Sequence, residues 1–94
     1  MEKEIREKIE KADLYQLDGD RWYNWQVSLW EKNGKSRLYV NLAYGRRRKW
    51  NRRASYFIDL KDFRIEENRR DYSNAYERSI CKNAAELAVE ILGK

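Results

Sequence analysis

Residues 22–45 read WYNWQVSLWEKNGKSRLYVNLAYG, and this stretch decides the fold of the chain. Two runs of alternating character flank Asn33-Gly34. Asn-Gly is typical of a two-residue type I′ turn, because both central positions of that turn need a positive φ. The sequence therefore predicts a β-hairpin with strands at 21–31 and 36–45.

The side-chain pattern predicts the register of this hairpin. With Lys32 opposite Lys35, every second cross-strand pair is apolar on both sides: Leu29 with Leu38, Val27 with Val40, Trp25 with Leu42, and Tyr23 with Tyr44. The positions between them pair Trp30 with Arg37, Ser28 with Tyr39, Gln26 with Asn41, and Asn24 with Ala43. A slip of one residue would mix the two sets, so turn chemistry and side-chain pattern indicate the same register.

Two helices are expected to flank the strands. Residues 2–15 are rich in Glu and Lys, with a narrow apolar stripe at helical spacing, and Gly19 is a natural stop after them. The second helix is expected at 73–92. Asn74 and Glu77 match the two ends of a capping box at its start.

A third strand is expected at 54–60, where apolar and polar residues alternate again. Residues 61–70 are expected to be a connector, with a short extended piece at 63–65. The resulting prediction is a single α+β domain spanning 1–94: a three-stranded antiparallel sheet in α-β-β-β-α order, with both helices packed on one sheet face.

The composition excludes several classes of site. With one cysteine, Cys81, and no histidine, we expect no intramolecular disulfide and no zinc or thiol–histidine site. Cys81 is expected to be a small buried residue. We expect no cofactor and no metal. No apolar run approaches the length of about 18 residues that a membrane span needs, and the charged start lacks a secretory signal, so a cytoplasmic chain is expected.

The basic charge is concentrated in residues 46–53, RRRKWNRR, which hold six cations and no acid. The whole chain has 21 Lys and Arg against 16 Asp and Glu, so without these six the balance is 15 against 16. A concentrated basic run is typical of an anion-binding segment. The segment is expected to be a mobile loop, with a projecting extension of the two strands as the alternative. Its candidate phosphate ligands are Arg46, Arg47, Arg48, Lys49, Arg52 and Arg53, and Trp50 is a candidate for stacking on a base.

The sheet face opposite the helices is expected to carry aromatic, amide and hydroxyl side chains. Its members are Trp22, Asn24, Gln26, Ser28, Trp30, Arg37, Tyr39, Asn41, Ser55, Phe57 and Asp59. Such groups stack on bases and hydrogen-bond to their edges, and we single out Gln26, Arg37, Tyr39 and Asn41. The same residue types are enriched at protein interfaces, and a cation–π pair of Trp30 with Arg37 would also stabilise the sheet alone.

Residues 82–94, KNAAELAVEILGK, resemble the second helix of double-stranded-RNA-binding domains, and the expected element order is also theirs. In that family a Lys-Lys-x-Ala-Lys phosphate clamp opens this helix. Residues 78–82 read RSICK here, which keeps the first and last basic positions. The family's Gly-Pro-x-His loop falls at residues 32–35, which read KNGK. The resemblance implies that Arg78 and Lys82 contact phosphates.

These features predict a small non-catalytic protein that binds DNA or RNA. One alternative is a protein-interaction module or homodimer, which would use the exposed aromatic face while the basic segment binds an acidic partner; anionic lipid is a further ligand for such a segment. A remote alternative is a Mg²⁺-dependent nuclease, for which the carboxylate pairs are Asp18 with Asp20 and Asp59 with Asp62.

Overall fold

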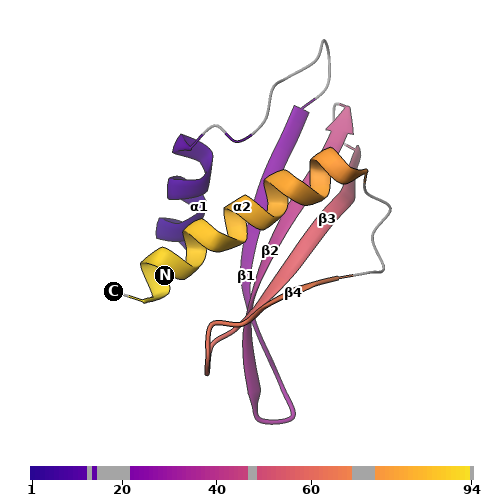
Figure 1. Ribbon diagram of the computed structural model, residues 1–94. Coiled ribbons are helices and arrows are strands. Elements are labelled where there is room, and N and C mark those ends of the chain that lie inside the picture. The colour runs from indigo at the N-terminus through magenta and orange to yellow at the C-terminus, as the bar shows by residue number, and fades with distance from the viewer. Residues whose placement is uncertain (13, 15–21, 47–48, 69–73, 94) are drawn as a thin grey trace.

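The computed structural model describes residues 1–12, 14, 22–46, 49–68 and 74–93. In chain order the elements are α1 (Glu2–Lys11), β1 (Trp22–Lys32), β2 (Lys35–Arg46), β3 (Lys49–Asp59), β4 (Ile65–Glu67) and α2 (Ala75–Leu92) (Figure 1). The four strands form one antiparallel sheet in the order β1-β2-β3-β4. The α+β class is confirmed, whereas the predicted three strands are wrong because β4 adds a fourth.

The β1–β2 hairpin has the predicted register. Lys32 lies opposite Lys35, and the pairing continues unbroken to Trp22 opposite Gly45. Asn33 and Gly34 have φ values of 53° and 74°, as a type I′ turn requires. Turn chemistry and alternation are sufficient to fix this element.

The helix boundaries differ from the prediction at the N-terminal helix. α1 ends at Lys11, not at residue 15, and the Ala12 N–H donates to the carbonyls of both Lys8 (3.1 Å) and Ile9 (3.2 Å). Such shared bonds tighten the last turn of a helix. The predicted stop at Gly19 lies outside the described residues.

The expected loop at residues 46–53, between the second and third strands, is wrong for the residues whose backbone is described. β3 begins at Lys49 instead of residue 54, and Lys49 pairs with Arg46 at the end of β2. The alternative of two extended strands is therefore confirmed. Pairing satisfies the backbone N–H and C=O groups of this segment, which an unpaired loop would leave to water.

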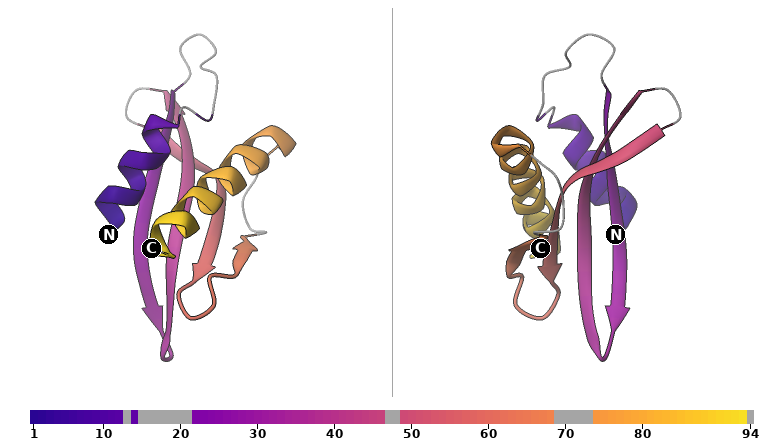
Figure 2. Two further views of the ribbon diagram at one scale, coloured as in Figure 1. Left: turned by 60° about the vertical axis from the view of Figure 1, so that its left-hand side comes forward. Right: turned by 90° about the vertical axis from the view of Figure 1, so that its right-hand side faces the viewer.

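A bulge interrupts this ladder. Leu42 pairs with Ala54, but the next residue, Ala43, pairs with Arg52, which leaves Arg53 as the extra residue on β3. A bulge bends the strand and re-aims the side chain that it carries. In the right-hand view of Figure 2, the paired end of β2 and β3 bends away from α2.

β4 follows a tight turn after β3. The Phe63 N–H donates to the Asp59 carbonyl (2.7 Å), and Phe63 adopts a φ of 60°. β4 then pairs with Tyr56–Ile58 of β3. The extended piece expected at 63–65 lies two residues further on, at Ile65–Glu67. Three residues are too few for alternation to reveal a strand.

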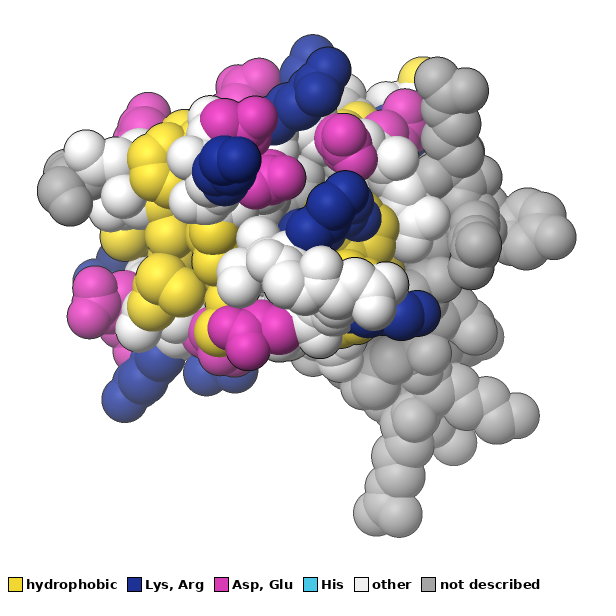
Figure 3. All heavy atoms as spheres, turned by 90° about the horizontal axis from the view of Figure 1, so that it is seen from below, with side chains coloured by type: hydrophobic (Ala, Val, Ile, Leu, Met, Phe, Trp, Pro, Cys, Tyr) yellow, Lys and Arg dark blue, Asp and Glu magenta, His cyan; other side chains and the backbone are white. Residues whose placement is uncertain are grey.

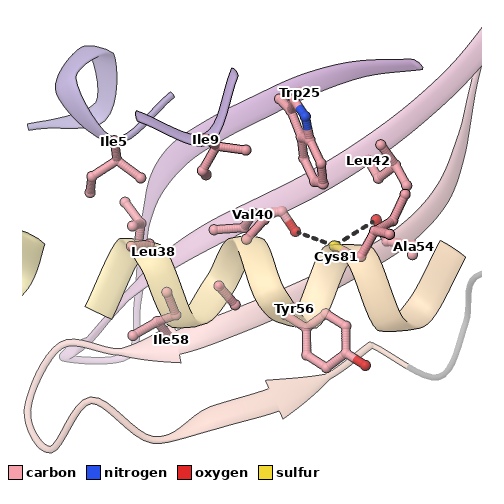
Figure 4. Close-up of a cluster of buried hydrophobic side chains, with 14 residues drawn as sticks. Ile5, Ile9, Trp25, Leu38, Val40, Leu42, Ala54, Tyr56, Ile58 and Cys81 are labelled. Carbon is pink, nitrogen blue, oxygen red and sulfur yellow. Dashed lines mark hydrogen bonds between the residues drawn. The ribbon is translucent and has the colours of Figure 1, made fainter. Parts of the chain in front are cut away.

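Both helices contribute to one buried core with the apolar set of strand residues (Figure 4). α2 crosses the sheet in front of β2 and β3, and α1 lies along β1 (Figures 1 and 2). The core consists of Ile5, Ile9, Trp25, Leu38, Val40, Leu42, Ala54, Tyr56, Ile58, Ile80, Cys81, Ala84, Ala85 and Ala88. The expectation for Cys81 is confirmed: it is fully buried, with Sγ 3.7 Å from the Val40 carbonyl oxygen and 3.5 Å from that of Ala54.

Among the described residues, no helix has the length and apolar character that crossing a membrane requires.

Candidate nucleic-acid interface

The basic segment forms the paired end of β2 and β3. Its register runs from Ala43 opposite Arg52 to Arg46 opposite Lys49, and places Trp50 opposite Gly45. At Arg46, Lys49, Trp50 and Arg52 the description is confined to the backbone, and Arg47 and Arg48 lie outside the described residues. We call residues 43–52 the basic ribbon. A two-stranded ribbon is a shape that the major groove of DNA admits.

Arg53, at the bulge, is held by Glu77 of α2. Its Nε donates to Glu77 Oε2 (2.9 Å) and its Nη2 donates to Oε1 (3.0 Å). Glu77 is only 2% exposed, whereas the Arg53 side chain is 34% exposed. Bidentate guanidinium–carboxylate pairs are strong and geometrically specific. The base of the basic ribbon is therefore joined to the first turn of α2.

The same carboxylate completes the cap of α2. Glu77 Oε1 accepts from the Asn74 N–H (3.2 Å), and Asn74 Oδ1 accepts from the Glu77 N–H (2.7 Å). The predicted capping box is confirmed. The sequence gives no sign of the second role of Glu77, because the bulge that brings Arg53 to it leaves no mark in the side-chain pattern.

The centre of the reverse sheet face is buried instead of open. Asn41 is 5% exposed and Ser55 1%. Asn41 Nδ2 donates to Gln26 Oε1 (3.0 Å), and the buried Asn41 Oδ1 has no hydrogen-bond partner in the part of the chain that the structure describes. Tyr39 Oη donates to Ser55 Oγ (3.1 Å) and lies 3.4 Å from Asn68 Nδ2. Of the four side chains singled out on this face, Gln26 is the most exposed.

Towards the hairpin turn, the reverse face carries a cluster of rings around Arg37. The guanidinium carbon of Arg37 lies 5.8 Å from the Trp30 ring centroid and 5.4 Å from that of Phe57. The Phe57 centroid is 4.7 Å from that of Tyr39 and 6.2 Å from that of Trp30. The expected contact of Trp30 with Arg37 is thus present, and Trp30 remains 41% exposed.

The two basic positions of α2 lie apart from this cluster. Arg78 Nε is 3.6 Å from Glu67 Oε1 of β4, and Lys82 is exposed. α2 packs on the core side of the sheet, whereas Gln26 and Arg37 alternate with the core residues of their strands. The structure therefore does not bring Arg78 and Lys82 together with the reverse face.

The carboxylates considered for Mg²⁺ take part in turn hydrogen bonds. Asp59 Oδ1 accepts from the Lys61 N–H (2.8 Å), and Asp62 Oδ1 accepts from the Arg64 N–H (3.0 Å). Asp18 and Asp20 lie outside the described residues. Within the described ranges, no three His, Cys, Asp or Glu side chains form a group that would hold a metal.

Comparisons with known proteins add no relative to this picture. No protein-family model, no curated protein and no solved structure matches the chain.

Proposed function

We propose that this protein is a non-catalytic nucleic-acid-binding protein that contacts DNA or RNA phosphates through the basic ribbon. The observation that carries the proposal is the pairing of residues 43–46 with 49–52, which makes the most basic segment of the chain a two-stranded ribbon. A two-stranded ribbon fits the major groove, where phosphates and base edges are both accessible, and basic residues are the types that contact them.

The ion pair at the base of the ribbon supports the proposal. Glu77 fixes Arg53 in a bidentate contact and so orients the ribbon relative to α2. Fixed geometry reduces the conformational entropy lost on binding. Because Arg53 is paired with Glu77, the proposal assigns the phosphate contacts to the other five cations of the segment: Arg46, Arg47, Arg48, Lys49 and Arg52. On duplex DNA, five contacts correspond to a slope of log affinity against log salt of about −4.5.

The test is a fluorescence anisotropy titration with four labelled oligonucleotides: single- and double-stranded DNA and RNA. The wild type is compared with the double variant Arg47→Ala/Arg48→Ala over a range of salt concentrations. We expect the variant to bind at least about tenfold more weakly, with a slope shallower by about 1.8, because each phosphate contact contributes about 0.9.

The matched control is Lys3→Ala/Lys11→Ala, which removes the same charge from exposed positions of α1. The control should keep most of the affinity. Equal affinity of the ribbon variant and the wild type, with no dependence on salt, would falsify the proposal. If duplex RNA is the preferred ligand, Lys82→Ala should also weaken binding, as the resemblance to double-stranded-RNA-binding domains implies.

A second candidate function, a homodimer, is favoured by β1, which is an edge strand of the described sheet. Residues 22–30 contain no charge and no proline, the usual devices that protect an edge strand. In the hairpin register, the backbone groups of Val27, Leu29 and Glu31 point away from β2, and no other described strand pairs with them. Leu29 is also 41% exposed. This edge is suited to antiparallel pairing with a second copy.

Light scattering coupled to size exclusion tests the dimer. Leu29→Lys should shift a dimer to monomer, because a charge on an edge strand opposes edge-to-edge pairing. Glu86→Lys, an exposed change on α2, is the control. A wild type that remains monomeric at all concentrations tested removes this candidate and leaves the first one standing.

A further inference from the structure

The β1–β2 turn carries a second cluster of cations, distant from the basic ribbon. Trp30 and Lys32 of β1 share the reverse face with Lys35 and Arg37 of β2, since all four occupy the alternation set that excludes the core residues. Together with Asn33, they line a shallow cavity of about 300 Å³. Figure 3 views the molecule from this end and shows Lys and Arg side chains beside apolar surface.

Lys32, Lys35 and Arg37 form no ion pair with a carboxylate of the described residues. Asp59 is opposite Arg37 in the sheet, but its Oδ1 accepts from the Lys61 N–H (2.8 Å). Three positive charges around one cavity favour an anionic ligand with more than one charge.

Trp30 offers a ring that is both exposed and positioned. The side chain is 41% exposed, yet Phe57 (6.2 Å between centroids) and the Arg37 guanidinium (5.8 Å) lie beside it. A positioned aromatic face is a stacking platform for an unpaired base, which a duplex does not offer. An aromatic ring flanked by cations matches the two chemical parts of a nucleotide, base and phosphate.

We propose that the β1–β2 hairpin end is a subsite for single-stranded nucleic acid, in which an unpaired base stacks on Trp30 and the adjacent phosphates contact Lys32 and Lys35. This proposal rests on the proposed function and deepens it by naming the form of the ligand. Lys35 and Arg46 stand at opposite ends of β2, roughly 36 Å apart at about 3.3 Å per residue. The hairpin end and the basic ribbon therefore contact different parts of a ligand.

Two exposed aromatic residues provide a matched pair of variants. Trp30 on β1 is 41% exposed and Tyr76 on α2 is 47% exposed, and α2 packs on the core side of the sheet, opposite the face that carries Trp30. Trp30→Leu should weaken binding of a short single-stranded oligonucleotide about tenfold and leave binding of a duplex of the same sequence within twofold. Tyr76→Leu, which removes an exposed ring from α2, should leave both affinities within twofold. Unchanged single-strand affinity in Trp30→Leu, or an equal loss with the duplex, overturns the subsite.

Indole NMR signals report the site directly. The chain has four tryptophans, so a ¹⁵N-correlated spectrum shows four indole N–H signals, and the one missing in Trp30→Leu belongs to Trp30. A single-stranded oligonucleotide should shift that signal, and a poly-glutamate peptide should not. An equal shift with poly-glutamate would assign the site to acidic peptides and overturn the base-stacking proposal.

The basic-ribbon variant separates this proposal from the proposed function. In Arg47→Ala/Arg48→Ala, the Trp30 signal should still shift with a short single strand, while duplex affinity falls. If the wild type binds single strands at Trp30 and the ribbon variant has unchanged duplex affinity, the hairpin subsite stands and the role of the ribbon fails. If no oligonucleotide binds the wild type, both proposals fail.

Discussion

Two arginines on the same sheet have different contacts: Arg37 on β2 contacts aromatic rings, whereas Arg53 on β3 pairs with a carboxylate. Arg37 belongs to an unbroken stretch of register and lies beside the rings of Trp30 and Phe57, with no carboxylate partner among the described residues. Arg53 lies at the bulge and is held by the buried Glu77 of α2. Residue type alone therefore does not make a strand cation available to a ligand, because the local register decides which elements its side chain contacts.

The largest effect is expected from removing the guanidinium at the bulge. Arg53→Ala leaves the carboxylate of Glu77, 2% exposed, without its bidentate partner. Breaking a buried pair costs about 3–5 kcal/mol, and we expect about 2–4 kcal/mol here because the Arg53 side chain is 34% exposed. Urea unfolding followed by circular dichroism measures this loss.

The double variant Arg53→Ala/Glu77→Gln is the control for that prediction. It removes the charge that Arg53→Ala leaves unpaired and keeps an amide oxygen to accept from the Asn74 N–H. It should therefore recover part of the stability lost in Arg53→Ala. A double variant less stable than Arg53→Ala would show that charge pairing is not what holds the ribbon base.

A smaller effect is expected at the other arginine. Arg37→Ala removes two cation–π contacts at a partly exposed position, which are worth about 0.5–1 kcal/mol each at such sites. We expect a stability loss of about 1 kcal/mol, clearly below that of Arg53→Ala, in the same urea experiment. Equal losses in the two variants would remove the contrast between the two regions.

The smallest effect, absent at neutral pH, is expected at Tyr56 on the core side of β3. Burial raises the pKa of Tyr56 above its usual value, and Glu67 and Cys81 add to this. The Tyr56 hydroxyl therefore keeps its proton to a higher pH in the folded state than in the unfolded chain. As the pH rises above about 10, the unfolded chain loses this proton first, and the free energy of unfolding should fall. Tyr56→Phe should reduce this alkaline loss, which thermal unfolding at increasing pH measures. An identical pH profile in both proteins contradicts the assignment.

The strand pairing between Trp22 and Gly45 and the capping box of α2 follow from the sequence alone. Each depends on residues close in the chain: an Asn-Gly turn with alternating neighbours, or an Asn and a Glu three positions apart. Among the candidate site residues, alternation also placed Trp30 and Arg37 together. It did not reveal the burial of Asn41, which follows from how the strands and their neighbours pack.

The sequence by itself determined the α+β class, the hairpin register, the capping box and the position of the positive charge. Only the tertiary structure decided where the β2–β3 register breaks, that β4 joins the sheet, and that Arg53 forms an ion pair with Glu77. The physical reason is the range of the interactions involved. Turns and caps are set by neighbours in the chain, whereas a bulge and a buried ion pair depend on how β2, β3 and α2 fit against one another, which no local pattern encodes.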